Sequence, residues 1–346
     1  MVAGLEYVVP LRWGSGTDPT EMTGYLQGLS REVDVTVVDG SEDAVWDRHH
    51  VLWSGFLRHV RVQEWPGRNG KVAGVVTGVR LARSEQVVIA DDDVRWTPAQ
   101  LRRAVALLAD ADLVRPQNYF DPAPWHARWD TGRTLLNRAL GADYPGTYAL
   151  RRSAFLAMGG YDGDVLFENL ELSRTVRAAG GTELTVPDLL VRRCPPGAGH
   201  FWGQRVRQAY DDFAQPARLA VEASLLPTAA LLTLGLRSRS PRRRRWAGAG
   251  LAAETLLPVA LAELGRRRAG GRAVFPADAA LWTPLWVAER AVCVWLAIGR
   301  RLGGGVPYAG ERLVTAAHST RFLRRRLARR TDEEQAVLRA PSPARR

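Results

Sequence analysis

Three consecutive aspartates, Asp91, Asp92 and Asp93, follow the apolar run "VVIA" of residues 87–90. Adjacent carboxylates repel one another, so the triplet indicates either a solvated turn or a place where a cation binds. Carboxylate oxygens suit Mg²⁺ or Mn²⁺, which usually keep the phosphates of a substrate as further ligands. Two other acidic motifs, that of prenyl transfer and that of aspartyl-phosphate enzymes, do not fit because Arg95 stands where each needs a different residue. These residues alone are compatible with both interpretations, a solvated turn and a metal site.

A second candidate site surrounds Lys71, the only lysine among the 48 basic residues of the chain. Gly67, Asn69 and Gly70 lead into it, and the pattern of residues 71–83 predicts a helix. An ammonium at a helix N-terminus attracts anions by its charge and by the helix dipole. A Walker loop is excluded, since a valine follows the lysine. The alternative is an ordinary junction between a loop and a helix with an exposed lysine.

Short apolar segments and amphipathic segments alternate along the first part of the chain. Such alternation predicts an α/β fold with an open, mostly parallel sheet, in which ligands bind beyond the carboxyl ends of the strands. Asp39 and the triplet at 91–93 would end two of these strands, so we expect them at the same edge. The predicted strands are residues 5–11, 33–41, 57–65, 85–90 and 111–119, with helices between the first two strands and at 71–83 and 97–110.

The character of the sequence changes after about residue 215, where three long apolar stretches begin. Each is close to the length that crosses a bilayer, but each also contains acidic residues, so spanning and surface attachment both remain open. Arginine-rich connectors flank the stretches, as is typical of the cytoplasmic side of a membrane. We expect a catalytic domain at 1–215, a hydrophobic helical membrane-associated region at 216–318 and a charged tail at 319–346. The apolar stretches are residues 219–236, 246–265 and 280–299.

The composition limits the classes of binding partner and the cellular compartment that fit this chain. The net charge of +12 allows an anionic substrate, an anionic lipid surface or a nucleic acid as partner. Cys194 and Cys293 are far apart and form no disulfide or zinc pattern, which fits a reducing compartment. The first 30 residues contain Glu6, Asp18 and Glu21 and no long apolar run, so we expect no secretory signal.

Six segments follow one another in the order and spacing of family 2 glycosyltransferases of the GT-A fold, and the chain from about 5 to 215 resembles their bacterial, membrane-associated members. The resemblance implies a Rossmann-like catalytic domain, a nucleotide-sugar donor that is UDP-linked, and a divalent Mn or Mg ion as cofactor. The segments are "YVVPL", "VTVVDGSED", "NGKVAGVVTGVRLAR", "VVIADDDV", "YPGTYALRRSAFLAMGGYD" and "LFENLELSRTVRAAGG".

The resemblance also assigns roles to residues. Asp91 and Asp93 match the metal-binding aspartates, with Asp91 shared between metal and donor. Gln204 and Arg207 match the Gln-x-x-Arg part of a motif whose tryptophan is replaced here by Gln208. The expected donor-binding residues are Asp39, Lys71, Asp91, Asp92, Gln204, Arg205 and Arg207.

The catalytic base is where the sequence departs from the family pattern. The family usually has an aspartate at the position of Asn169, and an amide cannot accept a proton. Glu168 or Glu171 must then serve as the base that activates the acceptor, or the base lies elsewhere. On a helix these two acids would lie on one turn.

The expected function is inverting, metal-dependent transfer of a sugar to a lipid-linked or glycan acceptor at the cytoplasmic face of the membrane, with membrane lipids and no nucleic acid as partners. A sugar-phosphate nucleotidylyltransferase is the first alternative. It would need a basic residue where Asp18 follows Gly16-Thr17. The second is a non-catalytic, membrane-bound module that binds a sugar nucleotide or lipid, which Asn169 permits.

Overall fold

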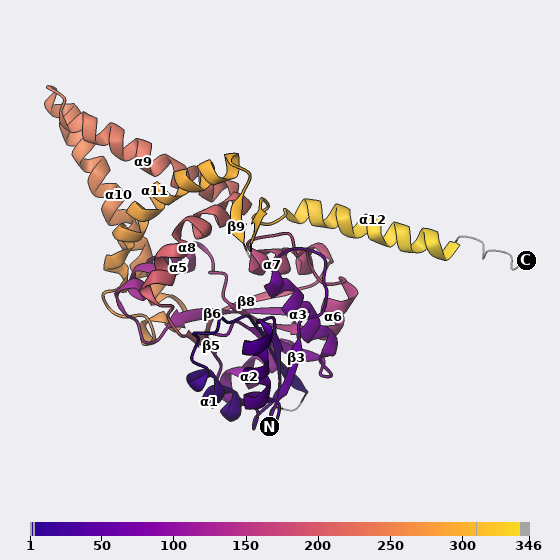
Figure 1. The fold of residues 1–346 in the computed structure, drawn as a ribbon. Coiled ribbons are helices and arrows are strands. Elements are labelled where there is room, and N and C mark those ends of the chain that lie inside the picture. The colour runs from indigo at the N-terminus through magenta and orange to yellow at the C-terminus, as the bar shows by residue number, and fades with distance from the viewer. Residues whose placement is uncertain (1, 3, 309, 340–346) are drawn as a thin grey trace, which may run out of the picture.

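The computed structural model describes residue 2, residues 4–308 and residues 310–339. Its centre is a sheet of eight strands with helices on both faces (Figure 1). The strand order is β3-β2-β1-β4-β7-β6-β8-β5. The strands are β1 (Leu5–Leu11), β2 (Asp34–Asp39), β3 (Arg58–Arg61), β4 (Gln86–Ala90), β5 (Val94–Arg95), β6 (Leu113–Phe120), β7 (Thr147–Arg151) and β8 (Glu183–Arg193).

The sheet is mixed, with its parallel half at the N-terminus of the chain. β1, β2, β3 and β4 run parallel, as the alternation of strands and helices predicts. β7 lies antiparallel between β4 and β6, and β5 lies antiparallel to β8. The carboxyl ends of β1, β2 and β4 therefore meet at one edge. The predicted α/β fold class is confirmed.

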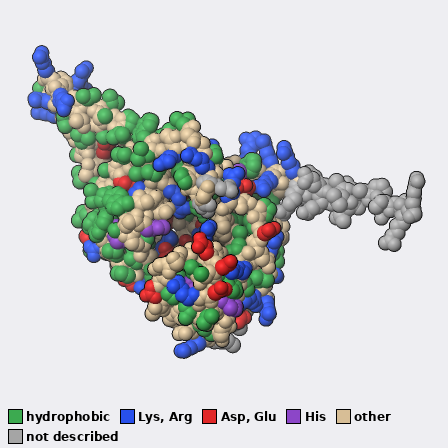
Figure 2. Space-filling view, viewed as in Figure 1, with side chains coloured by type: hydrophobic (Ala, Val, Ile, Leu, Met, Phe, Trp, Pro, Cys, Tyr) green, Lys and Arg blue, Asp and Glu red, His purple; other side chains and the backbone are tan. Residues whose placement is uncertain are grey.

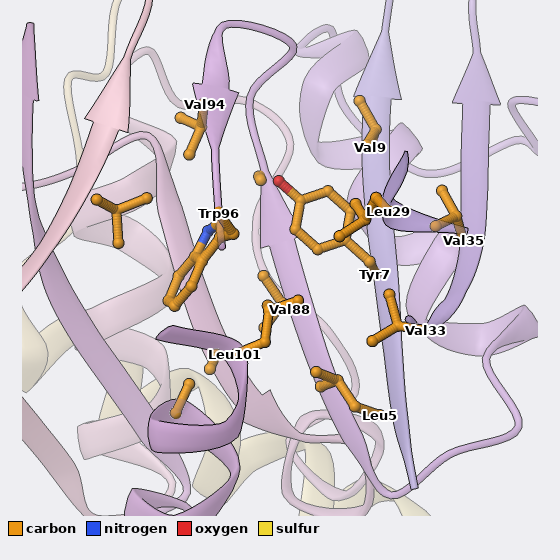
Figure 3. Close-up of a cluster of buried hydrophobic side chains, with 14 of the residues drawn as sticks. Leu5, Tyr7, Val9, Leu29, Val33, Val35, Val88, Val94, Trp96 and Leu101 are labelled. Carbon is orange, nitrogen blue, oxygen red and sulfur yellow. The ribbon is translucent and has the colours of Figure 1, made fainter. Parts of the chain in front are cut away.

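Side chains of the central strands alternate between two hydrophobic cores, one on each face of the sheet. Tyr7 and Val9 enter one core, shown in Figure 3, and Val8 enters the other. The first core is covered by α1 (Thr20–Leu29), α2 (Asp43–Trp53) and α4 (Pro98–Leu107), and the second by α3 (Gly70–Leu81), α6 (Arg152–Ala157) and α7 (Glu168–Ala178).

A close contact fixes α3 on the sheet. A Cβ atom on Gly78 would lie 2.2 Å from a methyl group of Val8, so only glycine allows this approach of helix to strand. The N-terminus of α3, which carries Lys71, is thereby held beside the end of β1. The sequence thus places this lysine at the strand edge through a small residue two turns further along the helix.

Two further helices belong to the sheet domain: α5 (Trp125–Leu140), between β6 and β7, and α8 (Ala198–Tyr210), after β8. Long apolar helices follow α8. α9 (Pro216–Leu236) and α10 (Pro241–Arg267) form a hairpin that projects from the body, and α11 (Thr283–Leu302) packs beside its base (Figure 1). By length and composition, three helical segments among the described residues could cross a membrane, and only 6% of the apolar window within Pro216–Leu236 is buried. Figure 2 shows hydrophobic side chains along the hairpin and basic ones at its tip, where six arginines between residues 237 and 245 are all exposed.

Two of the acidic residues within the apolar stretches pair with arginines of the protein. Glu222 of α9 is buried and pairs with Arg218 at 2.9 Å. Glu289 of α11 lies 3.5 Å from Arg205 of α8. Glu254, in the middle of α10, forms no ion pair within 4.0 Å among the described residues.

The chain returns to the sheet domain after α11. The hairpin of β9 (Val306–Tyr308) and β10 (Glu311–Leu313) follows, and then α12 (Thr320–Arg339). Backbone amides of Leu166 and Phe167 donate to the carbonyls of Thr315 and Ala316 at 3.0 and 2.8 Å. The segment beyond the third apolar stretch is thus bonded to the loop that precedes α7. Residues 340–346 of the expected charged tail lie outside the described residues.

Candidate functional site

A cavity of about 820 Å³ opens at the carboxyl ends of β1, β2 and β4. Its other walls come from the N-termini of α3 and α7, from α8 and the turn after it, and from Tyr308 of β9. Figure 2 shows acidic and basic side chains together around a hollow in this face of the molecule. The site edge predicted from the sequence is therefore where this cavity lies.

Lys71 joins two walls of this cavity. Asn69 caps α3 by accepting a hydrogen bond from the backbone amide of Lys71 at 3.1 Å. The ammonium lies 2.5 Å from Asp91 Oδ1 and also pairs with Glu168 Oε1. Burial would lower the pKa of this ammonium, but the carboxylates of Asp91 and Glu168 outweigh it and raise that pKa above its usual value. Lys71 therefore stays charged and bridges the strand end to α7.

The three aspartates of the triplet point to different partners. Asp91 and Asp92 line the cavity, and Asp92 accepts a hydrogen bond from the indole of Trp13. Asp93 accepts from Arg193 Nε at 2.8 Å through one oxygen, and its other oxygen is buried without a partner among the described residues. Burial raises the pKa of Asp93 to about 6.

The residues at the triplet fit a divalent cation. Asp91 faces the cavity, and the unpartnered oxygen of Asp93 is a hard ligand of the kind that Mg²⁺ and Mn²⁺ prefer. Arg193 also lies 3.4 Å from Asp91, so part of the negative charge is already balanced by the protein. Metal binding stays a prediction that this donor set allows.

Asp39, expected to bind the donor, is fully buried and does not line the cavity. Its oxygens lie 2.7 Å from His49 Nδ1 and 3.1 Å from His59 Nε2, and it accepts from the amide of Ser41 at 2.8 Å. Burial would raise its pKa, but these hydrogen bonds outweigh that and hold the pKa below its usual range. The backbone of Gly40, not the Asp39 carboxylate, therefore reaches the cavity.

Glu168 and Glu171, the two candidate bases on α7, lie in different environments. Glu168 lines the cavity, and burial raises its pKa above the usual value despite the opposing charge of Lys71. Glu171 is fully buried and does not line it. Its carboxylate accepts from the backbone amide of His318 at 2.7 Å and lies 2.9 Å from the imidazole Nδ1. Glu171 thus fastens the returning C-terminal segment and does not face a substrate.

The three expected residues of α8 also separate, because successive residues of a helix point about 100° apart. Arg207 lines the cavity, whereas Gln204 and Arg205 do not. Arg205 is buried, donates to Asp130 at 2.9 Å and lies over the ring of Phe201. Arg205 therefore holds α8 against α5 and has no free charge for a diphosphate.

Sequence reasoning missed other cavity residues, among them Gln208, Asp211 and Tyr308. A signal for Asp211 was present, because it follows Arg207 by four residues and so lies one helical turn further on the same side. Tyr308 had no local signal, since it comes from a strand more than two hundred residues beyond α3. It donates to the side chain of Asn69 at 2.9 Å.

One family of known proteins has a sequence model that matches part of this chain. Residues 32–159 match the sequence model of the family described as Glycosyl transferase family 2. No curated protein sequence matches the chain significantly.

Several solved structures are similar at low identity. The mannosyltransferase PcManGT from Pyrobaculum calidifontis, in complex with GDP-Man and Mn²⁺, has 18% identity and a TM-score of 0.46, over 84% of this chain and 87% of that one. GalNAc-T7 with UDP, GalNAc and Mn²⁺ has 15% identity and a TM-score of 0.37, over 56% of this chain and 44% of that one. A mycobacterial protein has 16% identity and a TM-score of 0.39, over 57% and 69%.

The matched region runs from the start of β2 to the turn after α6, and it includes Lys71 and the aspartate triplet. Of the remaining cavity residues, Pro10, Leu11 and Arg12 precede this region, and the others, from Leu166 to Tyr308, lie beyond it. The chain therefore contains a segment, residues 32–159, that matches the glycosyltransferase family 2 model, within a mixed, mostly parallel α/β sheet that is followed by long apolar C-terminal helices.

Proposed function

We propose that this glycosyltransferase transfers a sugar from a UDP-linked donor, with inversion, to a lipid-linked or glycan acceptor at the cytoplasmic face of a membrane. One observation carries the proposal: Lys71, at a helix N-terminus, bridges Asp91 and Glu168 inside a cavity at the carboxyl ends of parallel strands. Such an edge is where nucleotides bind in open α/β sheets. Inversion rests on the family resemblance.

On the donor side, Lys71 and Arg207 supply positive charge for the diphosphate, and Asp91 and Asp92 orient the donor. A divalent cation held by Asp91 and Asp93 would stabilise the charge that develops on the leaving diphosphate. The side chains of Asp39, Gln204 and Arg205 do not line the cavity and are not part of this proposal. Asp93 does not line it either, and it enters the proposal through its unpartnered oxygen beside Asp91.

On the acceptor side, a hydroxyl attacks the anomeric carbon as the bond to the diphosphate breaks, through an oxocarbenium-like state. The hydroxyl must lose its proton to a nearby base. Glu168 is the expected acid that reaches the cavity, and its ion pair with Lys71 already occupies one of its oxygens. Glu171 is committed to His318.

The apolar helices support a membrane location. The outer hairpin of α9 and α10 carries exposed leucines and few charges between its base and its tip. When the hairpin lies along the cytoplasmic face, on the same side as the catalytic body, the arginines at its tip are attracted by the anionic lipids of that leaflet. A lipid-linked acceptor would then be presented beside the catalytic cavity.

Thermal shift with a panel of UDP- and GDP-linked sugars, with and without Mn²⁺, tests the donor class. We expect stabilisation by one nucleotide sugar, loss of this stabilisation in Lys71→Met, and loss of its Mn²⁺ dependence in Asp93→Asn. Gly141→Ala is the matched control, because a Cβ there would meet nothing within 4 Å. Release of nucleoside diphosphate with a glycosylated product would support transfer.

Three outcomes contradict the proposal. The absence of any shift with every donor would remove the donor assignment. Release of pyrophosphate from a nucleoside triphosphate and a sugar phosphate would indicate a nucleotidylyltransferase. Donor binding with neither transfer nor donor hydrolysis, in membranes that supply lipid acceptors, would indicate a binding module.

A further inference from the structure

Four polar atoms around one end of the cavity are buried and have no hydrogen-bond partner among the described residues. They are Glu168 Oε2, Arg207 Nε, Gln208 Oε1 and Asp211 Oδ1. All four residues line the cavity, at the N-terminus of α7 and along the last turn of α8 into the 3₁₀ turn Asp211–Ala214. An unpartnered buried polar group costs about 1–3 kcal/mol. A cluster of them facing one cavity therefore points to a polar ligand.

The chemistry of these atoms selects the kind of ligand. Three of the four, on Glu168, Gln208 and Asp211, are oxygens that accept hydrogen bonds. Two carboxylates repel a phosphate but accept hydrogen bonds from hydroxyl groups. This end of the cavity is therefore suited to the hydroxyls of an acceptor, whereas the diphosphate belongs nearer to Lys71.

The other acids near this end each form at least one ion pair or hydrogen bond within the protein. Glu168 is paired with Lys71, and the carboxylate of Glu171 is bonded twice to His318. Asp212 is buried between Arg218 at 3.0 Å and Arg290 at 3.1 Å.

Asn169 lines the same cavity, but its amide cannot accept a proton. Asp211 differs from all of these groups. It lines the cavity, and it forms no ion pair within 4.0 Å in the described part of the chain.

We propose that Asp211 is the general base of the transfer, taking the role that Asn169 cannot fill; the inference rests on the proposed function. The acceptor oxygen forms a bond to the anomeric carbon, and the bond from that carbon to the diphosphate breaks with its electron pair on the diphosphate. The hydroxyl proton passes to the carboxylate of Asp211. The products are the glycoside, the nucleoside diphosphate and protonated Asp211, which returns its proton to water.

The electrostatics of the position agree with this role. Burial, together with the charges of Asp212 and Glu168, raises the pKa of Asp211 to about 7 against the opposing charges of Arg207 and Arg290. A base with a pKa near the working pH combines a useful fraction of the deprotonated form with enough basicity. We therefore expect kcat/KM to rise with pH and to level off above about 7.

Asp211→Asn tests the inference with a nearly isosteric change. We expect kcat to fall about 10²–10⁴-fold, with an unchanged donor-induced thermal shift and loss of the pH-dependent rise. Asp211→Glu should keep part of the activity with a displaced pH profile. Asn169→Asp in the Asp211→Asn background should restore activity, because a carboxylate then lines the same cavity from α7.

The outcomes separate this inference from the proposed function. Wild-type protein that transfers no sugar from any donor contradicts the proposed function itself. If the wild-type protein is active and the Asp211→Asn variant has the same kcat and the same pH profile, the assignment of Asp211 as the base is overturned, and the proposed function stands. Loss of the donor-induced shift in Asp211→Asn would instead show a donor-binding role and would also overturn it. If Asp211→Asn does not fold, an Asp211→Glu variant with the wild-type pH profile overturns the assignment.

Discussion

Gly146→Ala should displace the Asp91 carboxylate while leaving the fold almost intact. Gly146 precedes β7 and accepts a hydrogen bond from the backbone amide of Asp91 at 2.8 Å, so the two residues lie side by side. A Cβ on Gly146 would lie 2.3 Å from Asp91 Oδ2, about 1 Å closer than ordinary contact. The carboxylate is the mobile end of a side chain and can move, whereas the paired backbones need not.

The magnitudes follow from this displacement. Moving a side chain off its preferred rotamer costs about 0.5–1.5 kcal/mol, and replacing glycine by alanine at an accessible backbone conformation returns about 0.4–1 kcal/mol. The free energy of unfolding should therefore change by less than about 1 kcal/mol. A misplacement of about 1 Å in a catalytic site can cost about 10²-fold in rate. Activity should thus fall far more than stability.

Donor kcat/KM and the melting temperature, measured on the same preparations, check this prediction. Gly141→Ala, in the same connection between α5 and β7, is the matched control, since its Cβ would meet nothing within 4 Å. A Gly146→Ala variant with wild-type kcat/KM would refute the role given to Asp91. A large loss of melting temperature would refute the view that only the carboxylate moves.

Four further predictions follow. Arg205→Met should lower the free energy of unfolding by about 3–5 kcal/mol, because it removes the hydrogen-bonded partner of the buried Asp130 carboxylate and leaves only Arg133 at 3.8 Å. Arg207→Met should instead lower kcat/KM with little change in melting temperature, and the opposite pattern would reverse the two roles. Asp211→Asn should stabilise the fold more at pH 8 than at pH 5. The pKa of Asp211 is about 7 in the folded protein and 3.8 in the free group, so ionisation of this carboxyl lowers the free energy of unfolding as the pH rises from 3.8 to about 7. Equal shifts of the melting temperature at both pH values would contradict this. Glutamine at positions 242–245 should weaken binding to anionic vesicles by about 1 kcal/mol per arginine, seen as a lower salt concentration for release, while binding to zwitterionic vesicles should not change. Chelation of divalent ions should reduce the donor-induced thermal shift, and an unchanged shift would count against a metal.

Local sequence patterns predicted the elements that carry the donor side of the site. The β-branched strands, the helix that begins at Gly70 and the aspartates that end β4 all depend on contacts close in sequence. The position of β7 was not predictable in this way. It pairs antiparallel with β4 across more than fifty residues, and its short segment "TYALR" has no feature that fixes a direction.

The roles of charged residues were harder to predict than the helices and strands, because a charged side chain near a motif can face either the cavity or the protein interior. Arg205 and Arg207 have similar neighbours in sequence, and only the packing of α8 against α5 turns Arg205 into a buried ion pair. Glu171 matched a catalytic motif, but its partner His318 lies 147 residues away. Asp39 is enclosed by His49 and His59, which belong to no recognised motif.

The return of the chain after α11 affects how the enzyme can be divided. Tyr308 contributes to the cavity wall and donates to Asn69, the residue that caps the helix of Lys71. A fragment that ends near residue 215 would keep the strand ends that line the cavity but lose this wall, together with the backbone bonds that support α7. Deleting only the projecting α9–α10 hairpin, and joining its two ends at the base, would keep both. Lipid contact and catalysis would then become separable properties of one protein, and membrane attachment could be studied without opening the cleft.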